Sequence, residues 1–134
     1  MTSVEEHQKN IKQFLDDINE KIRAGLLLDR QKIIAFSASE AAANLLEYYL
    51  HKKQLVQAGF RVNHRYFTSE RKAESYFSFP FSKKQEIIKL LIKQEEYRDI
   101  LCYGKEKEIK KVQEAIDNLT KLKQLIIEEL GEEI

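Results

Sequence analysis

Apolar side chains recur every three or four positions along four stretches of the chain, a spacing that places them on one face of a helix. In the first stretch Ile11, Phe14, Leu15 and Ile18 share such a face. Glycines or capping side chains lie at the ends of the stretches, where helices commonly begin and end. The pattern predicts four long helices: from Val4 to Gly25, from a cap at Asp29 to about Gln57, from a Ser82–Gln85 capping box to Gly104, and from Ile109 to near Gly131.

The second stretch is apolar over a wide arc, which is typical of a helix surrounded by other helices. Three consecutive alanines, at positions 41 to 43, would let a neighbouring helix or the same helix of a second subunit approach closely, and we expect a dimer contact there. A polar seam of Ser37, Glu40, Asn44 and Glu47 runs along this helix and is expected to be solvated.

Residues 59–81 break the helical period and form a long connection, with a short helical turn expected after a cap at Ser69. The aromatic residues around Pro80 are expected to pack over the bundle rather than to form a partner surface. They are Tyr76, Phe77, Phe79 and Phe81. The expected fold is therefore all-α, a single domain over residues 1–134, built as an up-and-down bundle of four long helices plus a short connecting helix.

Composition narrows the functional classes. The chain has 134 residues, and its 23 Lys and Arg nearly balance 22 Asp and Glu, so any RNA contact must come from a local basic patch. One cysteine excludes an intramolecular disulfide, and we expect no metal site and no cofactor. His7 and His51 are expected to be exposed. No signal or membrane-spanning segment is expected, and the composition suits the cytoplasm.

A basic and aromatic segment follows the second predicted helix. Arg61, His64, Arg65 and Arg71 alternate with aromatic rings, which is typical of a surface that binds single-stranded RNA. In the alternative, Phe60, Tyr66 and Phe67 close the end of the bundle while the cations are only solvated. His64 could also supply a titratable group.

The segment from Arg98 to Gly104, at the end of the third predicted long helix, resembles the motif of the HEPN domain family. In that motif an arginine, here Arg98, is followed by a polar residue, here Asp99, and by a histidine or tyrosine, here Tyr103. The resemblance implies a small helical bundle that forms a homodimer, with the two arginine motifs in one cleft. It also implies metal-independent cleavage of RNA, with Arg98 as the cation beside the phosphate.

Tyr103 argues against efficient cleavage, because an ordinary tyrosine stays neutral at pH 7, whereas an ordinary histidine titrates close to that pH. Five residues at about 100° each also place Arg98 and Tyr103 roughly 140° apart on a regular helix. The two would meet only if the helix ends between them or if a second subunit supplies one of them. In the alternative, Arg98 pairs with Glu95 or a neighbouring acid and Tyr103 packs under the last helix.

The resemblance further implies a partner, a minimal nucleotidyltransferase in a two-component toxin and antitoxin pair, for which Tyr103 could be a target of nucleotide transfer. The chain would then be an RNA-directed protein with weak or absent ribonuclease activity. The alternative hypothesis assigns a different class of function, in which the bundle is a non-catalytic adaptor that binds another protein.

Overall fold

The computed structural model of the chain describes residues 4–134, which contain helices and no strands. The helices follow one another in the order α1 Val4–Arg23, α2 Gln31–Lys52, the 3-10 helix η1 His64–Phe67, α3 Glu70–Tyr76, α4 Lys84–Cys102 and α5 Ile109–Leu130. The predicted all-α class is confirmed. Among the described residues, no helix combines the length and the apolar character needed to cross a bilayer.

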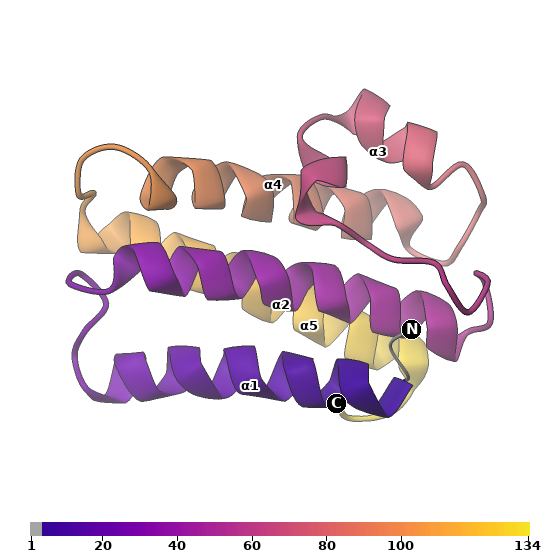
Figure 1. Ribbon diagram of the computed structural model, residues 1–134, viewed down its shortest axis with the longest axis horizontal. Helices are drawn as coiled ribbons and strands as arrows, with labels where there is room; N and C mark the ends of the chain where they lie inside the picture. The colour runs from indigo at the N-terminus through magenta and orange to yellow at the C-terminus, as the bar shows by residue number, and fades with distance from the viewer. Residues whose placement is uncertain (1–3) are drawn as a thin grey trace.

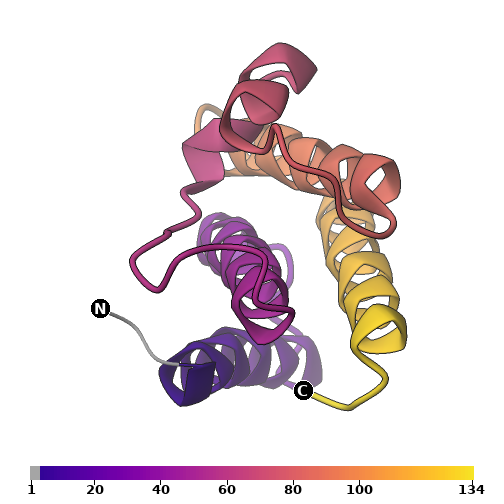
Figure 2. The ribbon, with the colours of Figure 1, turned by 90° about the vertical axis from the view of Figure 1, so that its right-hand side faces the viewer.

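Helix α2 lies at the centre of the molecule (Figure 1). Seen end-on, α1 lies below α2, α4 lies above it and α5 lies to its right, while η1 and α3 lie over α4 (Figure 2). The apolar side chains of α2 are buried from Ile34 to Leu50 except that of Phe36, which is 44% exposed. The wide apolar arc of this stretch correctly predicted its central position.

The three alanines of α2 are buried inside the single chain. Ala41, Ala42 and Ala43 are at most 4% exposed, so their small side chains admit helices of the same chain. The placement of a dimer contact at these residues is therefore wrong. The homodimer itself stays a prediction, and it would need another surface.

Several predicted helix ends are confirmed. Gly25, Gly104 and Gly131 all have positive φ, the conformation in which glycine commonly ends a helix. At the start of α3 the side chain of Ser69 accepts a hydrogen bond from the backbone N–H of Lys72. These signals act within a few residues of the chain, so the sequence alone reveals them.

The predicted cap at Asp29 is wrong, because a long-range contact fixes the start of α2 instead. The buried side chain of Gln31 donates to the carbonyl oxygens of Leu28 and Lys107, at 3.2 and 3.0 Å, and accepts from the N–H of Lys107 at 2.7 Å. No side chain caps the N-terminus of α2. The connection between α4 and α5 therefore holds this end.

The predicted Ser82–Gln85 capping box is also wrong. Helix α4 begins at Lys84, after Lys83 in a left-handed conformation with φ of 61°, and no side chain caps it. The carbonyl oxygen of Ser82 accepts a hydrogen bond from the hydroxyl of Tyr49 on α2. Packing of the connection onto the buried Tyr49 thus outweighs the local capping signal.

Helix α2 ends at Lys52, five residues before the predicted end at Gln57. Gln54 adopts φ of 57°, and the N–H of Leu55 donates to the carbonyl oxygen of Leu50. A left-handed residue with such a backbone bond closes a helix in the manner usual for glycine. Glutamine gives no such signal in the sequence, which explains the difference.

Of the aromatic residues around Pro80, Phe77, Phe79 and Phe81 pack onto the bundle, as predicted, whereas Tyr76 is 44% exposed. Phe77 is fully buried and its ring contacts those of Phe60, Phe67, Phe79 and Tyr66. These rings come from the connection after α2, from η1 and from the connection after α3. The cluster therefore fixes the position of η1 against the bundle.

Replacing Gly104 by alanine is expected to lower the free energy of unfolding by about 1 kcal/mol, because its φ of +81° is strained for a residue with a Cβ. Gly59 is the matched control, since it has no positive φ and open space around it. Gly59→Ala should instead be neutral or stabilise slightly, because alanine restricts the unfolded chain. Urea unfolding of both variants measures the difference, and equal effects would contradict the argument.

Candidate functional site

Arg98, the expected phosphate-binding cation, lies against α2. Its Nη1 donates to Ser39 Oγ and to Glu40 Oε1, both at 3.1 Å, and its Cζ lies 4.9 Å from the centre of the Phe36 ring. The side chain is only 11% exposed. An acid holds this guanidinium, as the alternative predicted, but the acid is Glu40 rather than Glu95.

The other two motif residues lie apart from that guanidinium. Asp99 is exposed. Tyr103 is the residue that follows α4, where the backbone is extended, and it is 63% exposed. Within residues 4–134, no hydrogen bond or ring contact joins Arg98 to Asp99 or Tyr103. The alternative in which Tyr103 packs under the last helix is wrong, and one chain alone does not assemble the motif into a site.

Cys102 lies on the same part of α4, and its thiol ionises less readily than that of an ordinary cysteine. Burial raises the pKa of its thiol, an effect that the nearby Arg98 opposes only in part. Its Sγ donates to the carbonyl oxygen of Lys32 at 3.3 Å. The thiol thus joins the end of α4 to the start of α2.

A histidine and a carboxylate meet one turn before Arg98 on α4. His64 Nδ1, at the start of η1, lies 3.0 and 2.9 Å from the two carboxylate oxygens of Glu95. The Glu95 side chain is 7% exposed and that of His64 is 19% exposed. Because a carboxylate only accepts, Nδ1 must donate, which leaves Nε2 with the lone pair of the neutral ring. Held by Glu95 in this way, His64 can therefore take a proton from a bound hydroxyl through Nε2.

The three predicted RNA-binding arginines are exposed and lie on both sides of His64 along the chain. They are Arg61, Arg65 and Arg71. In the part of the chain that the structure describes, none of them has an ion-pair partner. Tyr76, which is 44% exposed, stacks on Tyr66 with ring centres 3.7 Å apart. Cations and an open aromatic face thus lie on the segment around η1.

The aromatic residues of the same segment also close the bundle, as the alternative predicted. Phe67 is 1% exposed, and Phe60 and Tyr66 are partly buried against the core. The side chain of Asn63 caps η1 by accepting from the N–H of Arg65 at 2.9 Å. The rings therefore anchor the segment, which leaves its cations at the surface.

A second polar cluster lies between α1 and α2, where the sequence predicted only solvent. Ser37 and Glu47 of the seam are buried, and the seam residue Asn44 contacts His7, which is 2% exposed. The expectation that His7 is exposed is wrong, because its ring faces Glu47 at 2.5 Å. His51, on the last turn of α2, is half-buried and its ring stacks on that of His7.

The ligand atoms of His7, Glu47 and His51 all lie within 4.8 Å of one another, although the sequence predicted no metal site. The spacing of Glu47 and His51, four positions apart on one helix, is a signal that could have pointed to them. His7 comes from a different helix, and no local pattern connects it with the other two.

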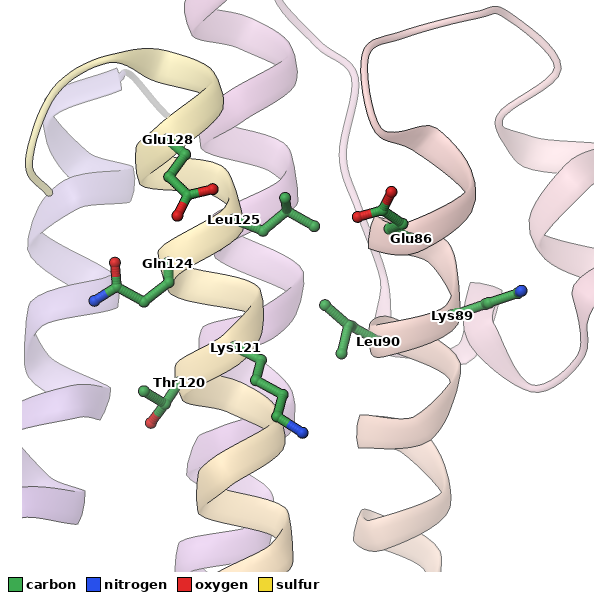
Figure 3. Close-up of a pocket in the computed structure, with 8 residues that line it drawn as sticks. All are labelled: Glu86, Lys89, Leu90, Thr120, Lys121, Gln124, Leu125 and Glu128. Atoms are coloured by element: carbon green, nitrogen blue, oxygen red, sulfur yellow. The ribbon is translucent and has the colours of Figure 1, made fainter.

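A groove of about 560 Å³ between the first half of α4 and the second half of α5 contains none of the predicted residues. Leu90 and Leu125 face each other across it, with charged and polar side chains at its rims (Figure 3). It offers no converging set of titratable groups comparable with the pair His64 and Glu95. We therefore place the candidate site at η1 and α4.

Comparison with known proteins gives no relative: no family model, no curated protein and no solved structure matches the chain. The resemblance to HEPN domains consequently depends on the residues themselves.

Proposed function

We propose that the chain is a HEPN-type, RNA-directed protein with an up-and-down bundle fold, whose single-stranded RNA ligand lies over η1 and the adjoining turn of α4. The observation that carries this proposal is the contact of His64 Nδ1 with both oxygens of Glu95, one turn from Arg98. A titratable group and a permanent cation are what metal-independent cleavage beside a ribose requires.

The proposed chemistry begins at His64. Its Nε2 removes the proton of a ribose 2′-hydroxyl, whose oxygen attacks the neighbouring phosphorus while the bond from phosphorus to the 5′-oxygen breaks. The leaving 5′-oxygen takes a proton from water, and a 2′,3′-cyclic phosphate remains. Glu95 orients the ring and stabilises the imidazolium that forms. His64 thus provides the proton transfer for which Tyr103 is poorly suited.

The ion pair of Arg98 limits the rate of this reaction. Its guanidinium must leave Glu40, or bind phosphate with the donors that Glu40 and Ser39 do not occupy. Since residues 4–134 of a single chain assemble no general acid for the leaving oxygen, we expect slow turnover and a function dominated by RNA binding.

RNA binding is tested first, by fluorescence anisotropy with single-stranded RNA at several salt concentrations. Each of Arg61→Gln, Arg65→Gln and Arg71→Gln should reduce the slope of log affinity against log salt by about 0.7, the value for one lost phosphate contact. Arg23→Gln, an exposed arginine at the end of α1, is the matched control and should leave the slope unchanged. Equal slopes in all variants would contradict the RNA surface.

Cleavage is tested next, in chelator to exclude metal ions. His64→Gln should reduce the rate about 100-fold or more if His64 is the base, and Glu95→Gln should reduce it less, because it keeps an acceptor for Nδ1. Tyr103→His should increase the rate only if Tyr103 lies near the RNA in the dimer. Cleavage that survives His64→Gln would exclude the proposed base.

The resemblance also supports a cytoplasmic homodimer whose partner is a minimal nucleotidyltransferase, with the exposed hydroxyl of Tyr103 as the group to be modified. Mass spectrometry after incubation with such a partner and a nucleoside triphosphate tests this step. Tyr103→Phe keeps the ring and removes the nucleophile, so it should abolish the added mass.

One observation favours the alternative function, a non-catalytic adaptor. Near the start of α2 and the end of α4, four large apolar side chains, Ile33, Phe36, Ile100 and Tyr103, are 37–63% exposed. A protein partner or a second copy could bury them. Under this alternative RNA binding would be absent, and none of the arginine variants would have an effect.

A further inference from the structure

The cluster formed by His7, Glu47 and His51 contains a buried nitrogen atom without a hydrogen bond. His7 Nε2 lies 2.5 Å from Glu47 Oε2, but the contact lacks hydrogen-bond geometry, so among the described residues this nitrogen has no hydrogen-bond partner. His7 is 2% exposed and Glu47 is 7% exposed. Solvent therefore has little access to this contact, and the polar atoms that form it need partners inside the protein.

The hydrogen bonds around His7 determine which nitrogen carries its proton. Asn44 donates through Nδ2 to the carbonyl oxygen of Glu40 at 2.8 Å, which turns Asn44 Oδ1 toward His7 Nδ1, 3.3 Å away. Since Oδ1 only accepts, Nδ1 donates and Nε2 has the lone pair of the neutral ring. Two lone pairs then face each other across the contact with Glu47, which is repulsive unless a proton or a metal ion binds to both.

The other two groups are arranged in the same way. His51 Nε2 lies 2.8 Å from the carbonyl oxygen of Phe60, so it donates there and leaves Nδ1 as the free lone pair. Glu47 Oε1 accepts from the backbone N–H of Val62, which leaves Oε2 for the cluster. Each of the three side chains thus has one atom held by an outer partner and one atom available.

We propose that His7 Nε2, Glu47 Oε2 and His51 Nδ1 bind one divalent transition-metal ion, for which Zn²⁺ is the reference. Two imidazoles and a carboxylate suit such an ion, and metal-bound imidazoles usually donate their second N–H to a carbonyl or amide oxygen. A tetrahedral zinc ion would leave its fourth position to water. Ligand atoms around zinc lie about 3.3 Å apart, so binding draws the most distant pair closer by up to about 1.5 Å. It also moves His7 Nε2 and Glu47 Oε2, which lie 2.5 Å apart, about 0.8 Å further from each other.

The site would connect three segments of the chain. His7 lies on α1, Glu47 and His51 lie on α2, and the outer partners Phe60 and Val62 lie in the connection that leads to His64. The bound ion would therefore fasten α1 to α2 and order the connection that precedes the RNA-binding segment. This role is structural and separate from the metal-independent chemistry proposed at His64.

The test uses the full, tag-free chain, stripped with chelator and titrated with Zn²⁺ and, separately, with Co²⁺. We expect one ion per chain, a rise in Tm with Zn²⁺ and the visible absorption of low-symmetry Co²⁺ with nitrogen and oxygen ligands. In ¹⁵N spectra of the imidazoles, Zn²⁺ should shift Nε2 of His7 and Nδ1 of His51 and leave His64 unchanged. If Zn²⁺ neither binds nor raises the Tm, His7 and Glu47 hold only a proton between them. That result would overturn the proposal.

Variants separate this site from adventitious binding. His51→Gln removes a half-buried ligand and leaves the pair of His7 and Glu47 intact, so it should fold normally and lose about 10- to 100-fold or more in Zn²⁺ affinity. The third histidine of the chain provides the matched control, because His64→Gln should bind Zn²⁺ as the wild type does. Equal affinity in both variants, or loss only in His64→Gln, would refute the assignment.

Discussion

Glu47→Ala is expected to lower the free energy of unfolding by about 3–5 kcal/mol, measured by urea unfolding in the presence of chelator. The carboxylate is 7% exposed and faces His7 on α1, while its other oxygen accepts from the N–H of Val62. Truncation leaves the N–H of Val62 without its acceptor, and it takes from His7 Nε2 the carboxylate with which, when no metal ion is bound, it shares a proton. Buried groups that lose such partners are not compensated by water. Chelator ensures that loss of a bound ion does not contribute.

Two control variants show whether burial is the cause. Glu86→Ala removes a carboxylate that is 60% exposed and pairs with Lys83 at 3.7 Å, so it should change stability by less than about 1 kcal/mol. Glu47→Gln keeps an acceptor for Val62 and should fall between the two. If Glu47→Ala were as mild as Glu86→Ala, solvent would have to reach the cluster, in disagreement with the structure.

The parts of the fold that the sequence predicted are those determined within a few residues. The period of apolar side chains gave the long helices, and the wide apolar arc placed α2 at the centre. Gly25, Gly104 and Gly131 end helices because the tolerance of positive φ is a property of glycine itself. Such signals survive in almost any tertiary context.

The predictions that failed concern positions where a distant contact competes with a local one. Asp29 does not cap α2, because Gln31 binds the connection at Lys107, 76 positions away. The capping box at Ser82 does not form, since its backbone is held by Tyr49. A cap contributes about 1 kcal/mol, which a buried hydrogen bond with its packing can exceed.

The sequence singled out residues of the candidate site but did not predict which side chains contact one another there. The sequence singled out Arg98 and His64, yet their partners Glu40 and Glu95 lie 58 and 31 positions away from them. No period or spacing relates residues so far apart, because only the packing of α2, η1 and α4 brings them together. The cluster around His7 was missed for the same reason, and its seam residues looked like an ordinary solvated face.

Phe77→Ala is expected to lower the free energy of unfolding by about 3–5 kcal/mol, because its fully buried ring cannot be removed without leaving a cavity. Four other aromatic rings contact it, and they come from the segments on both sides of η1 and α3. Thermal or urea unfolding measures the loss. Phe36→Ala is the matched control, since its ring is 44% exposed and its removal should destabilise the fold by about 1 kcal/mol.

The same substitution tests whether the segment that we propose to bind RNA depends on the core beneath it. Since Phe77 packs against Phe67 of η1, its loss should increase hydrogen exchange in η1 and α3 more than in α1 or α5. His64 would then no longer be held against Glu95, and RNA affinity should fall although no RNA-binding side chain has changed. Uniform exchange across all helices, with RNA affinity intact, would mean that the surface arginines bind RNA without a fixed geometry.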